Sequence, residues 1–140
     1  MISKKYRDLV QQAKQAKHFA YAPYSKFRVG VALLAADGTV FTGCNIENSS
    51  FGLTVCAERT AVFKAISEGA TSFAAMAIVS DSKKFTPPCG ACRQVLLELA
   101  GNIDFIMVDG SDKTKIVKLV SLLPSAFTTN DLITSYKSNK

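Results

Sequence analysis

The amino-acid sequence predicts an α/β fold in which two central helices pack on a five-stranded sheet. Runs typical of strands alternate with segments in which apolar residues recur at helical spacing, which is the pattern of an α/β sheet. Only about seven residues, Asp109 to Lys115, separate the last two expected strands, whereas a parallel crossover needs roughly a dozen or more. These two strands are therefore expected to be antiparallel.

Eight elements are expected along the chain. They are a helix at 4–20, strands at 27–36 and 40–46, a helix at 55–68, a strand at 73–79, a helix at 89–100, and strands at 103–108 and 116–120. The first helix has an apolar face and ends before Pro23, because proline cannot continue it. The first two strands flank Asp37-Gly38, a dipeptide typical of tight hairpins.

Caps and breaks define the later elements. Thr54 is expected to cap the second helix, and Gly69 is expected to stop it. The Pro87-Pro88 break precedes the third helix, which ends at Gly101. The remaining runs are short and apolar, as is typical of buried strands.

Composition and charge exclude several classes of protein. The chain has 140 residues, 48% of them hydrophobic, enough for the core of one domain spanning 1–140. No run approaches the roughly 18 apolar residues of a membrane span, and no apolar segment follows the basic N-terminus as in a secretory signal, so a cytoplasmic protein without membrane partners is expected. The net charge of +6 comes from the two ends, while residues 29–112 are net negative, which argues against nucleic-acid binding.

The chemistry is expected at the starts of the two central helices. Cys56-Ala57-Glu58 opens one, and Pro88-Cys89-Gly90-Ala91-Cys92 opens the other. Two cysteines three apart at a helix N-terminus can bind one zinc ion, because backbone N–H groups stabilise their thiolates. Cys56 can supply a third sulfur if the two helices begin side by side at one edge of the sheet. Three protein ligands leave the fourth position open, where zinc activates water close to Glu58.

These motifs resemble those of the zinc-dependent deaminases. C-A-E followed by P-C-G-A-C-R-Q is similar to the three-cysteine type found in the small homotetrameric cytidine deaminases. The segments 24–33, 43–48 and 123–127 also look like family segments, so that the resemblance covers roughly residues 5 to 130. It implies a three-layer α/β/α fold around a mixed five-stranded sheet. It also implies hydrolytic deamination of cytidine and deoxycytidine, a reaction of pyrimidine salvage.

The resemblance further implies a role for each site residue. One Zn²⁺ per chain would be bound, hydroxide on it would attack C4 of the pyrimidine, and a glutamate would shuttle the protons. The residues implied are Cys56, Cys89 and Cys92 as zinc ligands, Glu58 as the proton shuttle, Arg59 as hydrogen-bond donor to the thiolates, Phe27, Asn45, Glu47 and the Ala57 backbone as substrate contacts, and Phe127 as a substrate contact from a neighbouring subunit of a homotetramer. Family members often carry Tyr where this chain has Phe51, which puts any phenol hydrogen bond there in doubt.

Several alternatives remain open at this stage. Cys44 could complete a purely structural zinc site, in which no position is left for water. A deaminase acting on polynucleotides would share the zinc motif but would need a basic channel, and such members of the superfamily run their last two strands parallel. A deaminase of nucleoside analogues would share fold and ligands. Arg59 could be a surface residue, and Phe27 and Phe127 could be ordinary core aromatics.

Overall fold

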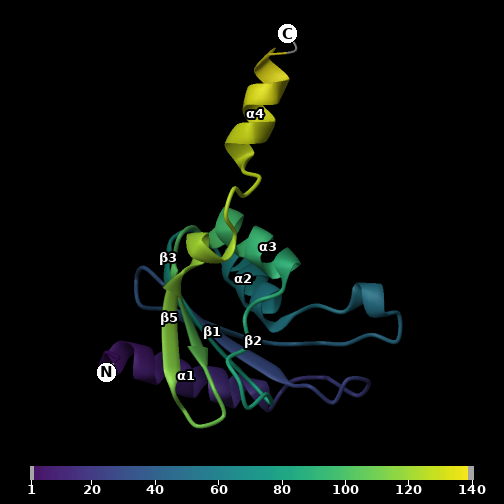
Figure 1. Cartoon of the computed structure of the whole chain (residues 1–140), viewed down its shortest axis with the longest axis vertical. Helices are drawn as coiled ribbons and strands as arrows, with labels where there is room; N and C mark the ends of the chain where they lie inside the picture. Colours follow the sequence, from purple (N-terminus) through teal and green to yellow (C-terminus); the bar gives the residue numbers. More distant parts are fainter. Residues whose placement is uncertain (1, 139–140) are drawn as a thin grey trace.

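The computed structural model describes residues 2–138 and shows a layered α/β body from which the C-terminal helix projects (Figure 1). Its elements are α1 (Lys4–Lys17), β1 (Val29–Ala35), β2 (Val40–Cys44), the 3₁₀ helix η1 (Phe51–Leu53), α2 (Ala57–Ser67), β3 (Phe73–Ser80), α3 (Gly90–Ala100), β4 (Asp104–Val108), β5 (Thr114–Lys118), the 3₁₀ helix η2 (Leu119–Leu122) and α4 (Thr129–Ser138). Within the described chain, no helix has the length and apolar character needed to cross a membrane.

The five strands form one mixed sheet in the order β2-β1-β3-β4-β5. The central strand β3 runs antiparallel to β1 and parallel to β4, and β1 is antiparallel to β2. The expected antiparallel pairing of the last two strands is confirmed, with Ile106 opposite Ile116. The short connection at 109–113 explains it, because so few residues can turn the chain back but cannot cross the sheet.

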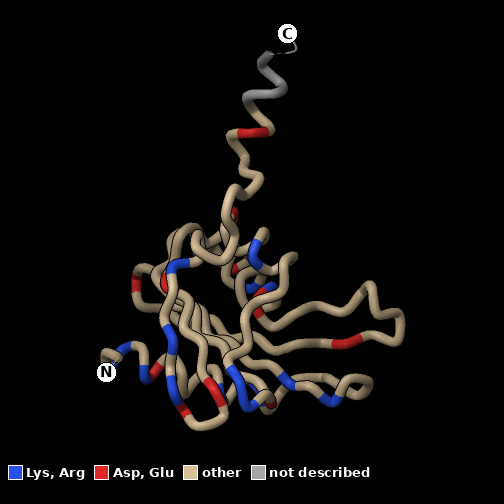
Figure 2. Tube along the Cα trace, in the orientation of Figure 1, with Lys and Arg blue, Asp and Glu red and all other residues tan. Residues whose placement is uncertain are grey.

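Among the described residues, basic side chains from the two ends of the chain lie on α1, on the segment before β1 and on β5 (Figure 2). Two of these basic residues are tied to the end of β3 by one carboxylate. Asp81 accepts from Arg28 Nε at 3.0 Å and pairs with Lys17 Nζ at 3.1 Å. The carboxylate of Asp81 therefore links α1, the start of β1 and the end of β3.

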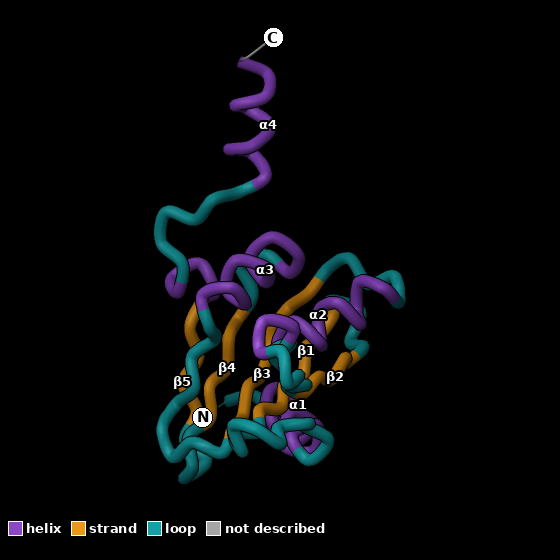
Figure 3. The backbone as a smooth tube through the Cα atoms, turned by 90° about the vertical axis from the view of Figure 1, so that its right-hand side faces the viewer, coloured by secondary structure: helices purple, strands orange, loops and turns teal. Residues whose placement is uncertain are grey.

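Helices cover both faces of the sheet, which confirms the three-layer α/β/α arrangement (Figures 1 and 3). Leu9, Val10 and Ala13 of α1 pack on one face. The other face lies under α2 and α3, and alternating residues of β1 point to the two sides. Val31 and Leu33 contact the α2/α3 layer, whereas their neighbours in sequence contact the α1 layer. Burial on both faces explains why these strands are continuously apolar.

The order of the strands brings the starts of α2 and α3 to the same edge of the sheet. Because β2 and β3 are both antiparallel to β1, they run in the same direction, and each leads into a helix on the same face. Gly43 of β2 allows α2 to lie very close to the strand, since a Cβ at this position would be 2.5 Å from the Ala57 carbonyl oxygen. The topology therefore places the starts of α2 and α3 side by side at one edge of the sheet, which is the arrangement that a cluster of Cys56, Cys89 and Cys92 requires.

Some expected boundaries are wrong, each for a local reason. Cys56 rather than Thr54 caps α2, because the Thr54 hydroxyl accepts a hydrogen bond from the backbone of Asn48. The first helix ends at Lys17 rather than at residue 20, since Tyr21 pairs with Ile46 as an isolated bridge.

The C-terminal elements also differ from expectation. The strand expected at 116–120 is found at Thr114–Lys118, and the chain then winds into η2. The sequence pattern predicted no element after residue 120, yet α4 occupies Thr129–Ser138 and extends away from the layered body (Figures 1 and 3). The start of α4 carries a local signal that apolar periodicity does not record, because the Thr128 N–H donates to Asp131 three residues later, as in a capping box.

Candidate active site

The three cysteines of the two helix starts come together as expected. Cys56 caps α2, Cys89 caps α3, and Cys92 lies in the first turn of α3. Their three sulfur atoms all lie within 4.8 Å of one another, with Cys89 Sγ 3.2 Å from Cys92 Sγ and 3.8 Å from Cys56 Sγ. The remaining cysteine, Cys44, is not part of this group of the described residues.

This cluster fits a zinc ion. Zinc–thiolate bonds of about 2.3 Å at tetrahedral angles place sulfur atoms about 3.8 Å apart, which is close to the spacing found here. The donor set is three soft sulfurs, and the helix N-termini that carry them favour negative charge. Since Cys44 is not in the group, the described residues offer three sulfur ligands at this cluster and not four, which disfavours a closed structural site.

Arg59 provides a positive charge beside the sulfurs. Its Nη2 donates to Cys56 Sγ at 3.5 Å. Hydrogen bonds from the Cys92 thiol and from Arg59 lower the pKa of Cys56 to about 5, and the Cys56 thiolate together with burial raises the pKa of Cys92. The buried Arg59 Nε has no hydrogen-bond partner among the described residues. This guanidinium is therefore directed to the cluster and is not the free surface group considered above.

Glu58 is buried beside the cluster, in the first turn of α2. Only 4% of its surface is exposed, which is unusual for a carboxylate without a salt bridge. Burial raises the pKa of the Glu58 carboxyl. A raised pKa moves a carboxyl toward the range in which it can both take up and release a proton near neutral pH.

A cavity of about 270 Å³ opens beside the cluster and collects most of the expected site residues. Its lining residues include Phe27, Asn45, Glu47, Cys56, Ala57, Glu58 and Cys89. The first turn of α2 points its backbone N–H groups toward this end of the molecule, and the N–H of Ala57 is one that no helical carbonyl can accept. The volume is at the small end of the range for ligand sites, as expected for a small polar molecule.

Asn45 and Glu47 hold the loop that carries Phe27. The Asn45 side chain accepts from Val29 N at 2.8 Å and donates to the Phe27 carbonyl at 2.8 Å. Glu47 Oε1 accepts from the backbone N–H groups of Tyr24 and Ser25. Hydrogen bonds from the Ser25 side chain and from these backbone groups lower the pKa of the Glu47 carboxyl, so that it is held as a carboxylate at the cavity wall. These two residues thus shape the cavity wall in addition to lining it.

Two residues of interest lie outside the cavity of their own chain. Phe127 is 62% exposed and is not among the cavity-lining residues. Phe51 is 70% exposed in η1, where its ring meets that of Tyr24 edge-on at a centroid distance of 5.7 Å. The described chain by itself therefore does not bring either ring to the cluster, and neither aromatic belongs to the core.

Sequence reasoning missed part of the cavity wall. Ile78 near the end of β3, together with Thr86 and Pro87 before Cys89, lines the cavity. The Thr86 hydroxyl is fixed by Ser80 Oγ at 2.6 Å. The Pro87-Pro88 break directly before a metal ligand was the available signal, since residues next to a ligand must lie near the metal.

The comparisons with known proteins agree with this geometry. Residues 3–108 match the family model described as the cytidine and deoxycytidylate deaminase zinc-binding region. The chain belongs to this family of zinc-binding deaminases, and it is an enzyme. Its fold is also that of solved members, because a crystal structure of cytidine deaminase from Burkholderia pseudomallei superposes with a TM-score of 0.85 at 43% identity, covering 90% of this chain and 100% of that chain.

Individual relatives are similar over most of their length. The cytidine deaminase of Sporosarcina psychrophila is 49% identical over 125 residues, which cover 89% of this chain and 92% of the relative. The cytidine deaminase of Halalkalibacterium halodurans is 50% identical over 125 residues, covering 89% and 95% respectively. A crystal structure of the Mycobacterium tuberculosis cytidine deaminase has a TM-score of 0.77 at 42% identity, covering 89% of this chain and 98% of that chain.

Proposed function

We propose that this enzyme hydrolyses cytidine and deoxycytidine to uridine and deoxyuridine with release of ammonia. The observation that carries the proposal is the placement of a buried carboxylate, Glu58, beside a cluster of three thiols in one small cavity. The names of the relatives support cytidine as the substrate. The free thiols fit a reducing cytoplasm, where the reaction would serve pyrimidine salvage.

The metal of this proposal is one zinc ion per chain, held by Cys56, Cys89 and Cys92. When bound, it would supply a Lewis acid that makes water acidic near neutral pH. Three thiolates and one Zn²⁺ leave a net charge of −1, which weakens the Lewis acid. Arg59 offsets this effect, because its hydrogen bond to Cys56 draws charge away from the sulfur.

Glu58 moves the protons of the reaction. Its carboxylate takes a proton from the attacking water and gives it to N3 of the pyrimidine while the water oxygen bonds to C4. It then takes the second proton from that oxygen and gives it to the exocyclic amine, and the C4–N4 bond breaks to release ammonia. Water and the nucleoside thus account for every atom of uridine and ammonia.

The other cavity residues hold the nucleoside. The Ala57 N–H faces the pyrimidine carbonyl at C2, and Phe27 packs on the nucleoside. The ribose 3′-hydroxyl interacts with Asn45 and Glu47, which both line the cavity. Phe127 covers the open face of the pyrimidine from a neighbouring subunit of a homotetramer, which agrees with its exposure in a single chain.

Two alternative functions have less support. The described residues that line the cavity include no Lys or Arg, and the basic residues gather on α1 and β5, so a polynucleotide path is not favoured (Figure 2). The antiparallel pairing of β4 and β5 points the same way. A preference for nucleoside analogues would share the metal cluster and the carboxylate, and slow turnover of both cytidine and deoxycytidine in the assay below would favour it.

The test is an absorbance assay with cytidine, deoxycytidine, cytosine and a cytosine-containing single strand, run beside zinc analysis. We expect turnover of the two nucleosides and little of the others. Glu58→Gln is the control, because glutamine has the same shape but cannot shuttle a proton; it should retain zinc and lose roughly 10²- to 10⁴-fold in rate or more. Rapid turnover of the single strand, or a Glu58→Gln variant within tenfold of the parent, would refute the proposal.

A further inference from the structure

The helix that contributes two of the three cysteines also holds the C-terminal segment along its side. Directly after Cys92, two consecutive residues of α3 donate hydrogen bonds to that segment. Arg93 Nη1 donates to the Leu122 carbonyl at 2.7 Å, and Gln94 Nε2 donates to the Phe127 carbonyl at 2.7 Å. The helix α3 therefore holds both the backbone of Phe127 and two of the three cysteines, Cys89 and Cys92.

Between these two carbonyls the chain makes a turn that its own residues do not favour. Ser125 has a φ of +53°, in the left-handed region that non-glycine residues rarely adopt. Such a conformation persists only when the surrounding structure holds it. The bond from Arg93 lies before the turn and the bond from Gln94 lies after it. Together they fix the path of the segment on both sides of Ser125.

The two donors differ in what else they hold. Arg93 Nε also donates to the Pro88 carbonyl at 2.8 Å, directly before the expected metal ligand Cys89. A change at Arg93 would therefore disturb the cluster as well as the segment. In the part of the chain that the structure describes, the Gln94 side chain donates to Phe127 alone. Gln94 can thus be changed with little direct effect on the metal cluster.

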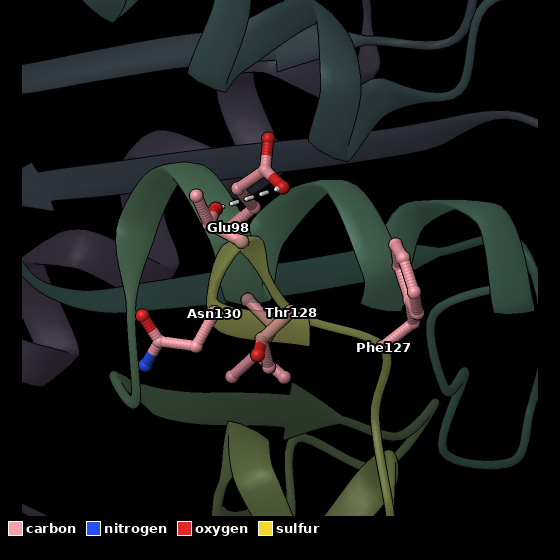
Figure 4. Close-up of a pocket in the computed structure, with 6 residues that line it drawn as sticks. Glu98, Phe127, Thr128 and Asn130 are labelled. Carbon is pink, nitrogen blue, oxygen red and sulfur yellow. Dashed lines mark hydrogen bonds between the residues drawn. The ribbon is translucent and has the colours of Figure 1, made fainter. Parts of the chain in front are cut away.

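The fixed backbone determines where the Phe127 ring stands. Figure 4 shows the ring beside α3, where Phe127 lines one shallow hollow together with Glu98, Thr128 and Asn130. In the residue after Phe127, the Thr128 N–H donates to Asp131 Oδ2 at 2.7 Å, and this hydrogen bond caps the start of α4. The backbone on both sides of Phe127 is therefore held, whereas the ring itself is exposed.

We infer that Gln94 is a positioning residue, which holds the Phe127 backbone so that its ring is presented ready-made to the nucleoside site of a neighbouring copy. This inference rests on the proposed function, in which Phe127 covers the pyrimidine of another subunit. Without the Gln94 bond the ring would have to be ordered each time substrate binds, and that ordering cost weakens binding. Glu58 and the metal cluster are untouched, so that the chemical step changes less than substrate binding.

The test is a kinetic comparison of Gln94→Ala with the parent enzyme, with cytidine as substrate. Loss of one neutral hydrogen bond predicts a KM raised roughly three- to tenfold, with kcat within twofold and the zinc content unchanged. Gln94→Glu has the same shape but presents an anionic oxygen to the Phe127 carbonyl instead of a donor, so it should raise KM at least as much as Gln94→Ala. Gln94→Lys keeps a donor and should return KM toward the parental value. Gln15→Ala, the same change on an exposed position of α1, is the matched control and should leave KM unchanged.

A double variant separates positioning from a general structural effect. If Gln94 acts through Phe127, adding Gln94→Ala to Phe127→Ala should change KM by no more than twofold. Multiplied effects, or a Gln94→Ala enzyme with the parental KM, would overturn the inference while leaving the proposed function intact. A Phe127→Ala enzyme with the parental KM would instead remove the shared pocket of the proposed function, and the role of Gln94 with it. If Gln94→Ala does not fold, Gln94→Glu provides the same comparison.

Discussion

Single side chains determine the chemistry of the cavity. Arg59 is the cation that contacts the sulfur cluster, and the carboxylate of Glu58 is buried next to it. Glu58 and Arg59 lie two and three residues after Cys56, so that the N-cap and first turn of α2 carry a candidate metal ligand, a proton carrier and a balancing charge. This is why the four residues from Cys56 to Arg59 could indicate the site. The short spacing leaves these groups no freedom to lie elsewhere once α2 is formed.

The identity of the metal ligands can be tested at this scale. Cys89→Ala removes one of three sulfurs, and we expect its zinc content to fall far below one ion per chain. Cys44→Ala should retain close to one ion per chain, because Cys44 lies outside the group of sulfurs. Metal analysis of the two purified variants beside the parent gives the result. Equal loss of zinc from both variants would mean that Cys44 is a fourth ligand and that the site is closed.

At the scale of elements, the site depends on how closely α2 approaches β2. Gly43 permits this approach, since a Cβ there would lie 2.5 Å from the Ala57 carbonyl oxygen and 2.6 Å from the Ala61 nitrogen. Both atoms are backbone and cannot move aside without shifting the helix. The position of Cys56 and Glu58 relative to α3 therefore depends on a residue that touches neither of them.

Gly43→Ala should disturb the site by moving α2. Overpacking of this kind typically costs about 1–3 kcal/mol, so we expect a lower free energy of unfolding in urea together with weakened zinc binding. Gly52→Ala is the control, because nothing lies within 4 Å of a Cβ at that position. Its stability should stay within about 0.5 kcal/mol of the parent. A Gly43→Ala protein with parental stability and zinc content would show that the two elements can separate without consequence.

The ion pairs at the end of β3 give a pH dependence of stability. Arg28, through hydrogen bonding and charge, holds the pKa of Asp81 well below its usual range, and Lys17 adds to this effect. A carboxyl whose pKa is lower in the folded state stabilises the fold above its unfolded pKa of about 3.9. That contribution is lost as the pH falls toward and through the folded pKa.

Asp81→Asn should therefore be less stable than the parent at pH 7, by about 1–2 kcal/mol, and the difference should shrink as the pH falls below about 4. Urea unfolding at pH 7 and at pH 3 measures both quantities. Asp112→Asn removes a more exposed pair with Lys14 and should cost about 0–1 kcal/mol. A difference for Asp81→Asn that is constant with pH would assign the effect to packing rather than to charge.

On the scale of the whole molecule, the sequence predicted helices packed on a sheet, but it did not predict α4 at the C-terminal end. Apolar periodicity predicted the alternation of strands and helices, and the short connection at 109–113 predicted the antiparallel pairing of β4 and β5. The strand order, which brings both helix starts to one edge, does not follow from periodicity. Boundaries such as the start of α2 depended on one competing hydrogen bond at Thr54, which no periodicity records. The positions of α4 and Phe127 were harder to predict. Phe127 and Leu132 are exposed in the single chain, so no packing contact within the described part of the chain fixes their side chains.

Exposure of Phe127 outside its own cavity leads to the last prediction, which concerns assembly. If neighbouring copies complete each other's sites, Phe127→Ala should raise KM and lower kcat together, and activity of the parent should fall on dilution below the dissociation constant of the assembly. Mixing Phe127→Ala chains with Glu58→Gln chains supplies the decisive measurement. After co-refolding, some sites combine an intact Glu58 from one chain with an intact Phe127 from the other, and deamination should reappear. Separately refolded proteins, mixed without exchange, are the control. An enzyme that is fully active as a monomer, or a mixture that recovers no activity, would mean that each chain builds its own site.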